Sequence, residues 1–118
     1  MANILIVDDS KTSRKMLTGI LQSAGHTVIG EAADGRAGVE QYKALQPDLV
    51  TMDITMPLLD GIAALREIME YDKSAKIIMV TAAGQKDKML EAVKCGASDF
   101  LSKPYDQDMI ISIINTVL

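Results

Sequence analysis

Short runs of apolar, mostly β-branched residues alternate along the chain with longer stretches whose apolar positions recur every three or four residues. The short runs predict five strands, which cover 4–7, 27–32, 49–53, 76–82 and 99–103. Three of these strands are apolar almost without interruption, as is typical of strands covered on both faces. The pattern therefore predicts an α/β protein in which helices sandwich a parallel sheet.

The longer stretches predict five amphipathic helices. The first has an apolar stripe that consists of Met16, Leu17, Ile20, Leu21 and Ala24. Gly25 follows this stripe, at the position where a helix commonly ends. The last helix begins near Asp106, a suitable N-cap residue. The residues expected to face the sheet from it are Met109, Ile110, Ile113, Ile114 and Val117.

Three further helices complete the alternation. The second is expected over 35–45, the third begins after Asp60 and Gly61, and the fourth ends before Gly96. The apolar residues of the fourth are Met89, Ala92 and Val93. Because the loops that follow parallel strands converge beyond the carboxyl ends of the strands, we expect functional residues there.

Composition narrows the class of protein. The 118 residues match one compact domain, so a single domain is expected over 1–118. Apolar residues make up 48% of the chain and charged residues 24%, as in an ordinary soluble globular protein. The net charge of −4 argues against the basic face that sequence-independent binding of nucleic acid requires.

No apolar run approaches the roughly 20 residues that span a bilayer, and the N-terminus does not resemble a signal peptide. We therefore expect a cytoplasmic protein without membrane contact. The single cysteine, Cys95, has no internal disulfide partner and is interpreted as a small buried residue in a reducing compartment.

Chemically useful side chains stand at the ends of four predicted strands. They are Asp8, Asp9, Asp53, Thr81 and Lys103. Carboxylates about 4 to 5 Å apart repel one another by roughly 3 to 4 kcal/mol at an effective dielectric constant near 20, so a cation is needed among them. Carboxylates, carbonyl groups and water are the ligands that Mg²⁺ prefers, which predicts a magnesium site.

Plainer interpretations stand beside this one. Asp8 or Asp9 could cap the helix that follows, as in many strand–helix turns. Lys103 could be an ordinary solvated lysine, although Pro104 follows it directly.

Four segments, each at a strand end, carry a resemblance to a known family. They are VDDS at 7–10, MDITMPLLDG at 52–61, VTA at 80–82 and KPY at 103–105. Over its whole length the chain resembles the receiver domain of two-component response regulators, most like the stand-alone chemotaxis regulators of the CheY type. The resemblance implies a (βα)5 doubly wound, three-layer sandwich with a parallel sheet of order 2-1-3-4-5, the flavodoxin-like arrangement.

The resemblance also implies a reaction. Asp53 would be the phosphoacceptor, taking a phosphoryl group from a histidine kinase with Mg²⁺ present. Asp9, Asp53 and the backbone carbonyl of Thr55 would hold the metal, with Asp8 contributing through water. The chain would thus be a switch that takes part in its own phosphorylation and slow dephosphorylation, not an enzyme.

Further roles follow from the same resemblance. Lys103 would bind one phosphoryl oxygen, and the Thr81 hydroxyl with the Ala82 amide would bind another. The peptide between Lys103 and Pro104 would be cis. Thr81 and Phe100 would form the switch, although burial as a plain core aromatic would also explain Phe100.

The implied partners are a histidine kinase and an output protein such as a flagellar motor switch protein, with the chain acting as a monomer. The fourth helix, fifth strand and fifth helix would form the output face. Lys11, Arg14 and Lys15 would dock the phosphodonor, although a solvated helix face is equally compatible with these charges. Thr55 and Ala83 occupy positions that tune phosphoryl lifetime, and neither is expected to assist dephosphorylation strongly.

Four alternatives remain open. The chain could be a receiver domain cut from a larger regulator with a separate output domain. A phosphatase of the haloacid dehalogenase type is favoured only by DIT at 53–55, and needs its nucleophile on the first strand. A receiver-like module without phosphorylation would lack some of the site residues, and a nucleotide-binding domain would need a glycine-rich first turn in place of DDSKTSR.

Overall fold

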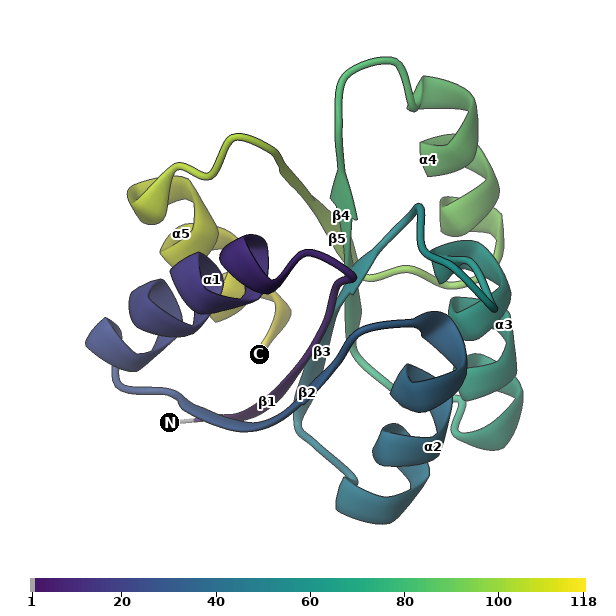
Figure 1. The fold of residues 1–118 in the computed structure, drawn as a ribbon, viewed down its shortest axis with the longest axis horizontal. Helices are drawn as coiled ribbons and strands as arrows, with labels where there is room; N and C mark the ends of the chain where they lie inside the picture. The colour runs from purple at the N-terminus through teal and green to yellow at the C-terminus, as the bar shows by residue number, and fades with distance from the viewer. Residues whose placement is uncertain (1) are drawn as a thin grey trace.

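Strands and helices alternate from one end of the chain to the other (Figure 1). The computed structural model describes residues 2–118, and within them lie five strands and five helices. The elements are β1 (Asn3–Val7), α1 (Lys11–Ser23), β2 (Thr27–Ala32), α2 (Gly35–Leu45), β3 (Leu49–Asp53), α3 (Gly61–Tyr71), β4 (Ile77–Thr81), α4 (Lys86–Lys94), β5 (Asp99–Ser102) and α5 (Gln107–Val117). The strands form one parallel sheet in the order β2-β1-β3-β4-β5, so the expected fold and strand order are confirmed.

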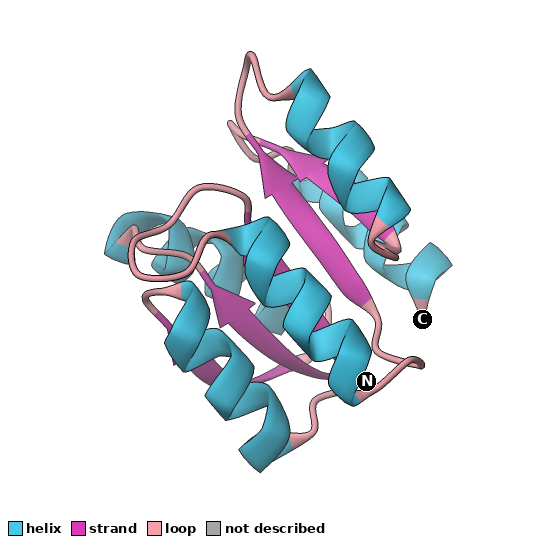
Figure 2. Cartoon of the chain, turned by 90° about the vertical axis from the view of Figure 1, so that its right-hand side faces the viewer, coloured by secondary structure: helices cyan, strands magenta, loops and turns pink. Residues whose placement is uncertain are grey.

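The sheet lies between two helical layers. Helices α1 and α5 cover one face, and α2, α3 and α4 cover the other (Figure 1). The latter three lie side by side in front of the sheet in Figure 2. Successive residues of a strand point to opposite faces, so β1 feeds two cores. Ile4 and Ile6 pack toward α1 and α5, whereas Leu5 and Val7 pack on the other side.

Three methionine and valine side chains differ from the expected helix stripes. Met16, Met109 and Val93 were expected to face the sheet or carry the apolar stripe, but each is more than half exposed, at 53%, 57% and 55%. Each stands one residue from the centre of the buried stripe of its helix, and one residue turns a helix by about 100°. Cys95, expected to be buried, is only partly buried.

The predicted strand limits at 76–82 and 99–103 were each slightly too long. The structure ends β4 at Thr81 and β5 at Ser102. Main-chain pairing stops where the loops turn toward the next helix, although the Lys103 N–H still donates to the Thr81 carbonyl at 2.8 Å. Within residues 2–118, no helix is both long and apolar enough to cross a membrane.

A glycine fixes the loop after β3. A Cβ atom at Gly61, the first residue of α3, would lie 1.9 Å from the main-chain oxygen of Asp53. The Gly61 N–H donates to the carbonyl of Ile54 at 2.7 Å. Helix α3 therefore starts in direct contact with the end of β3, and Asp60 caps it by accepting from the Ala63 N–H.

Candidate functional site

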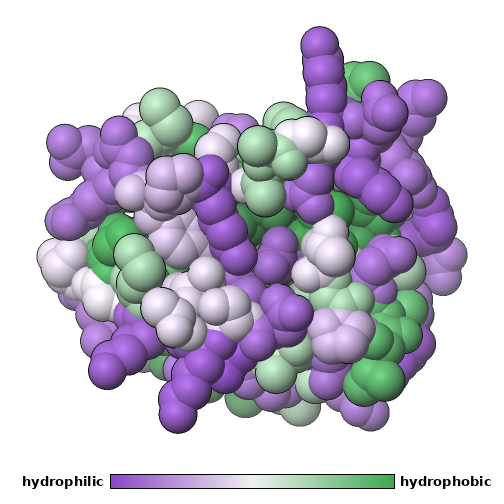
Figure 3. All heavy atoms as spheres, turned by 45° about the horizontal axis from the view of Figure 1, so that its top comes forward, coloured by the Kyte–Doolittle hydropathy of each residue, from purple (hydrophilic) through white to green (hydrophobic). Residues whose placement is uncertain are grey.

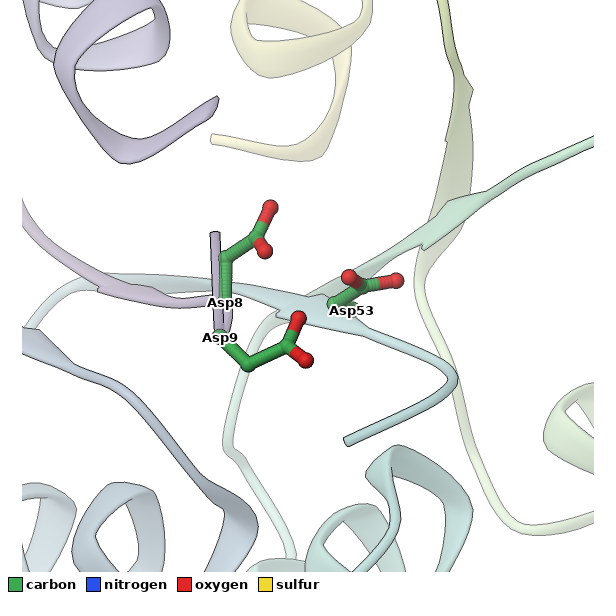
Figure 4. Close-up of side chains that lie close together, drawn as sticks. All are labelled: Asp8, Asp9 and Asp53. Carbon is green, nitrogen blue, oxygen red and sulfur yellow. The ribbon is translucent and has the colours of Figure 1, made fainter. Parts of the chain in front are cut away.

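The carboxyl ends of adjacent strands bring three aspartates together. Asp8 and Asp9 follow β1, and Asp53 is the last residue of the neighbouring β3. One carboxylate oxygen from each lies within 4.8 Å of the others (Figure 4). Asp8 and Asp53 are buried, whereas Asp9 is exposed at the rim. The structure thus groups the three acids that the sequence proposed as metal ligands.

This donor set fits a hard divalent cation. All three groups offer oxygen, which is the ligand atom that Mg²⁺ prefers, and the exposed side at Asp9 leaves access for water. Part of Asp8 is already committed, because its Oδ1 accepts from the Ser10 N–H at 2.8 Å. The remaining carboxylate oxygens face one another across a space where like charges repel.

The capping interpretation of the two adjacent aspartates is wrong. Ser10 is the N-cap of α1, and its hydroxyl accepts from the Ser13 N–H at 3.2 Å. Asp8 and Asp9 therefore stand before the helix and remain available to the site.

Lys103 neutralises part of the acidic charge. Its Nζ lies 3.1 Å from Oδ2 of Asp8 and 3.3 Å from Oδ2 of Asp53. Its main chain is tied to the end of β4 through Thr81, and its peptide bond to Pro104 is cis. Only 27% of the Lys103 side chain is exposed, so it is not an ordinary solvated lysine.

The site raises the pKa values of both Asp53 and Lys103, for different reasons. Burial first, and then the negative charge of Asp8, raise the pKa of the Asp53 carboxyl to about 6, although Lys103 pulls it down. Burial opposes the charge of the Lys103 ammonium, but Asp8 and Asp53 outweigh it and raise the pKa of Lys103. Asp53 is therefore held at a cost in its ionised form, which a further cation would relieve.

The end of β4 supplies a hydroxyl and an amide beside the acids. Thr81 is buried, and its hydroxyl makes only a long contact of 3.4 Å to the carbonyl of Leu101. The Ala82 N–H already has a partner, because it donates to Oε1 of Gln85 at 2.6 Å. The Gln85 Nε2 donates in turn to the Thr55 hydroxyl at 2.8 Å.

Sequence reasoning missed Gln85. A polar residue in the loop after a strand carries little signal, since such residues are common in loops. Its position directly before the first residue of α4, where N-cap residues stand, is the signal that could have drawn attention to it.

Phe100 lies on β5 and is partly buried. It packs against the core on the α2, α3 and α4 side of the sheet. Its neighbour Leu101 points to the other side, where it joins the core under α1 and α5. Phe100 is therefore beside the layer that contains α4, and its role as a switch stays a prediction.

The basic residues at the start of α1 do not behave alike. Arg14 donates from Nη1 to the carbonyl of Asp8 at 2.7 Å and pairs with Glu31 at 3.0 Å, with 16% of its side chain exposed. Lys11 and Lys15 are exposed. Arg14 thus supports the loop that holds the acids, and only the two lysines fit a solvated helix face.

The end of the molecule that carries the site comes forward in Figure 3, where hydrophilic side chains dominate and apolar atoms show in patches between them.

Comparison with known proteins places this geometry in context. The family model of the response regulator receiver domain matches residues 4–115. The chain is 50% identical over 114 residues to the chemotaxis protein CheY of Thermotoga maritima, covering 97% of this chain and 95% of that protein. It is 49% identical over 115 residues to CheY of Bacillus subtilis, covering 98% and 96%.

A solved structure is also similar. It is the CheX-CheY-BeF3-Mg+2 complex from Borrelia burgdorferi, with a TM-score of 0.93 and 43% sequence identity, over 98% of this chain and 87% of that one. These likenesses agree with the resemblance carried by the strand-end segments.

Proposed function

This chain belongs to the response regulator receiver domain family and is of the CheY type, and from that premise we propose that Asp53 accepts a phosphoryl group from a histidine kinase. The observation that carries the proposal is the position of Asp53. It lies at the end of β3 between Lys103 Nζ, at 3.3 Å, and the carboxylates of Asp8 and Asp9. A single carboxylate is therefore surrounded by groups that bind cations and anionic oxygens.

In the proposed reaction, a carboxylate oxygen of Asp53 attacks the phosphorus of a phosphohistidine. A P–O bond forms, the P–N bond breaks, and its electron pair returns to the imidazole nitrogen of the donor. Charge in such a transfer spreads over three equatorial oxygens, and catalysis consists mainly of positioning and neutralisation. Lys103 would bind one of these oxygens, and the Thr81 hydroxyl with the Ala82 N–H would bind another; the contact of Lys103 with Asp53 supports the first role.

The acidic side of the same site would hold Mg²⁺. Asp8, Asp9, Asp53 and the backbone carbonyl of Thr55 form the proposed ligand set, and the grouping of the three carboxylates supports it. When bound, Mg²⁺ supplies positive charge to the acidic cluster and to the transferring group. Lys103 supplies one positive charge to three carboxylates, so two negative charges stay unmatched, which favours a divalent ion.

We further propose that phosphorylation changes the face formed by α4, β5 and α5 through Thr81 and Phe100. Thr81 ends β4 and Phe100 stands on the adjacent β5, and these positions support a link from the site to that face. The output partner is proposed to belong to chemotaxis, such as a flagellar motor switch protein, because the similar curated proteins are chemotaxis proteins. Action as a single monomeric domain over 1–118 is part of the same proposal.

The haloacid dehalogenase alternative loses its support. That family needs the nucleophilic aspartate on its first strand, whereas Asp53 ends the third strand along the chain. The receiver family model, moreover, covers residues 4–115.

Phosphotransfer from a phosphorylated histidine kinase tests the proposal directly. We expect radiolabelled phosphoryl groups to appear on the chain with Mg²⁺, to disappear with a chelator, and to be absent from Asp53→Asn. Asp108→Asn, which changes an exposed aspartate on α5, is the matched control and should be labelled like the original protein. Label on Asp53→Asn, or none on the original protein with metal and several donors supplied, would refute the proposal.

A further inference from the structure

Helix α4 begins differently from the other helices of residues 2–118. Each of the others has an N-cap side chain that accepts from the N–H three residues later. These N-cap residues are Ser10, Asp34, Asp60 and Asp106. The N-cap residue of α4 is Gln85, and within the described chain its side chain makes no capping hydrogen bond. The first N–H groups of α4 thus lack the partner that helix ends usually receive.

The Gln85 carboxamide is instead directed across the site. It accepts from the Ala82 N–H at 2.6 Å and donates to the Thr55 hydroxyl at 2.8 Å. This pair of hydrogen bonds, called the Gln85 bridge below, joins the loop after β4 to the loop after β3. Gly84, with φ of +85°, lets the chain fold back so that Gln85 reaches Ala82.

The bridge is a specific contact in an otherwise open loop. Ala82, Ala83, Gly84 and Lys86 are exposed, whereas Gln85 is partly buried. A hollow of about 470 Å³, lined by Thr81, Ala82, Gln85 and Lys103 among others, adjoins it. A displaced carboxamide therefore has space to enter without disturbing the core.

We propose that the Gln85 bridge occupies the phosphoryl-binding amide of Ala82 in the unphosphorylated protein, and that Gln85 must leave before a phosphoryl oxygen can bind there. The inference rests on the proposed function, because it assumes that Asp53 carries the phosphoryl group. One N–H at 2.6 Å from an amide oxygen has no second hydrogen bond of equal strength to give. Gln85 Oε1 and a phosphoryl oxygen therefore compete for the Ala82 N–H.

The competition couples the site to α4. The group that a phosphoryl oxygen displaces belongs to the residue at which α4 begins, so phosphorylation releases the start of this helix from Ala82 and from Thr55 at the same time. Gln85 is a positioning residue in this scheme. It sets the affinity of the site for a phosphoryl group without touching Asp53.

Binding of beryllofluoride, a phosphoryl mimic, in the presence of Mg²⁺ tests the inference. We expect Gln85→Ala to bind it about three- to tenfold more tightly than the original protein, the effect of losing one competing hydrogen bond. Thr55→Val, which removes only the second half of the bridge, should give a smaller gain. The double variant should gain no more than Gln85→Ala, because the two hydrogen bonds act as a unit.

Two controls separate this effect from a general structural change. Gln41→Ala removes another glutamine whose carboxamide bonds to the main chain, at Glu31, and it should leave the affinity unchanged. In NMR spectra without metal or mimic, Gln85→Ala should shift the Ala82 amide resonance, while affinity for Mg²⁺ alone stays the same. Should Gln85→Ala not fold, Thr55→Val carries the same test, since it breaks the donation from Gln85 Nε2 to the Thr55 hydroxyl.

The outcomes distinguish the two proposals. If the original protein neither binds beryllofluoride nor accepts phosphoryl groups, the proposed function fails and the bridge loses its role. If the original protein binds it and Gln85→Ala binds equally or more weakly, only the competition by Gln85 is refuted.

Discussion

The Nζ atom of Lys103 lies 3.3 Å from Oδ2 of Asp53, a residue 50 positions earlier in the chain. The contact forms because β5 and β3 both end at the same edge of the sheet, on either side of β4. It joins the proposed phosphoacceptor to the cation that offsets part of its charge.

Removing the ammonium group of Lys103 should alter both the ionisation and the reactivity of Asp53. In Lys103→Met, we expect the pKa of Asp53 to rise above about 6, because burial and Asp8 then act without opposition from the ammonium group. The rate of phosphorylation should fall by about 100-fold, as is typical when a group that stabilises developing charge is removed. NMR titration and phosphotransfer kinetics measure the two effects. Lys73→Met, at an exposed position, is the matched control, and equal rates in the two variants would contradict the expectation.

Metal binding should stabilise the fold through Asp9. Because a ligand that binds only the folded state adds stability, Mg²⁺ at about 100 times its dissociation constant should raise the free energy of unfolding by about 2.7 kcal/mol. Asp9→Asn should weaken Mg²⁺ binding by about tenfold or more, yet should be no less stable than the original protein in a chelator, since one repelling charge is gone. Thermal unfolding with and without Mg²⁺ gives both numbers. Asp108→Asn is again the control. If Mg²⁺ stabilises Asp9→Asn as much as it stabilises Asp108→Asn, Asp9 is not a ligand.

His26 should make stability depend on pH below neutrality. It is 8% exposed, its Nδ1 accepts from the Ala2 N–H at 3.1 Å, and burial lowers its pKa below 6.5. The unfolded chain then binds more protons than the folded one, so stability is present above the unfolded pKa and is lost as the pH falls below it. Protonation would also remove the acceptor at Nδ1, a loss of about 1 kcal/mol.

Urea unfolding of the original protein and of His26→Asn at pH 7.5 and 5.5 isolates this contribution. The difference between the two proteins cancels the opposite effect of Asp53, whose raised pKa favours the folded state as it becomes protonated. We expect the stability of His26→Asn to fall less between the two pH values. Parallel changes in the two proteins would assign the pH dependence to other groups.

Two glycines should respond to alanine in opposite ways. At Gly61 a Cβ atom would meet the main chain of Asp53 and Ile54, so Gly61→Ala should cost about 3 kcal/mol and weaken Mg²⁺ binding by moving the end of β3. At Gly19, inside α1, a Cβ atom meets nothing within 4 Å, so Gly19→Ala should stabilise by about 0.5 to 1 kcal/mol. Urea unfolding curves of both variants measure these changes. A Gly61→Ala variant as stable as the original protein would show that the close approach at Gly61 is relieved by local movement.

The sequence was sufficient to predict the features that depend on periodicity and on strand ends. The strands were identified because buried parallel strands are apolar on both faces, and the grouping of Asp8, Asp9 and Asp53 followed from where those strands stop. Lys103 could be assigned to the same edge for the same reason. The strand order came from the resemblance to receiver domains, because alternation of strands and helices alone is compatible with several orders.

What could not be predicted depends on geometry that has no periodic signal. Met16 and Met109 are apolar residues beside a buried stripe, and only the packing of their helices decides that they face outward. Arg14 lies in the first turn of α1 and Gln85 in the loop before α4. Their partners, Asp8, Ala82 and Thr55, are set by distances of 2.6 to 2.8 Å. Such contacts depend on side-chain conformations that the chain adopts only after the sheet has formed.

The helical layers are not anchored equally. Within residues 2–118, α4 contributes one buried side chain, that of Ala92. Each of the other helices buries at least two residues, and α3 buries five. Leu90 and Val93 of α4 face outward and add little to its attachment. Amide hydrogens of α4 should thus exchange with solvent through local opening well before those of α3, because α4 can detach with the loss of fewer buried side chains.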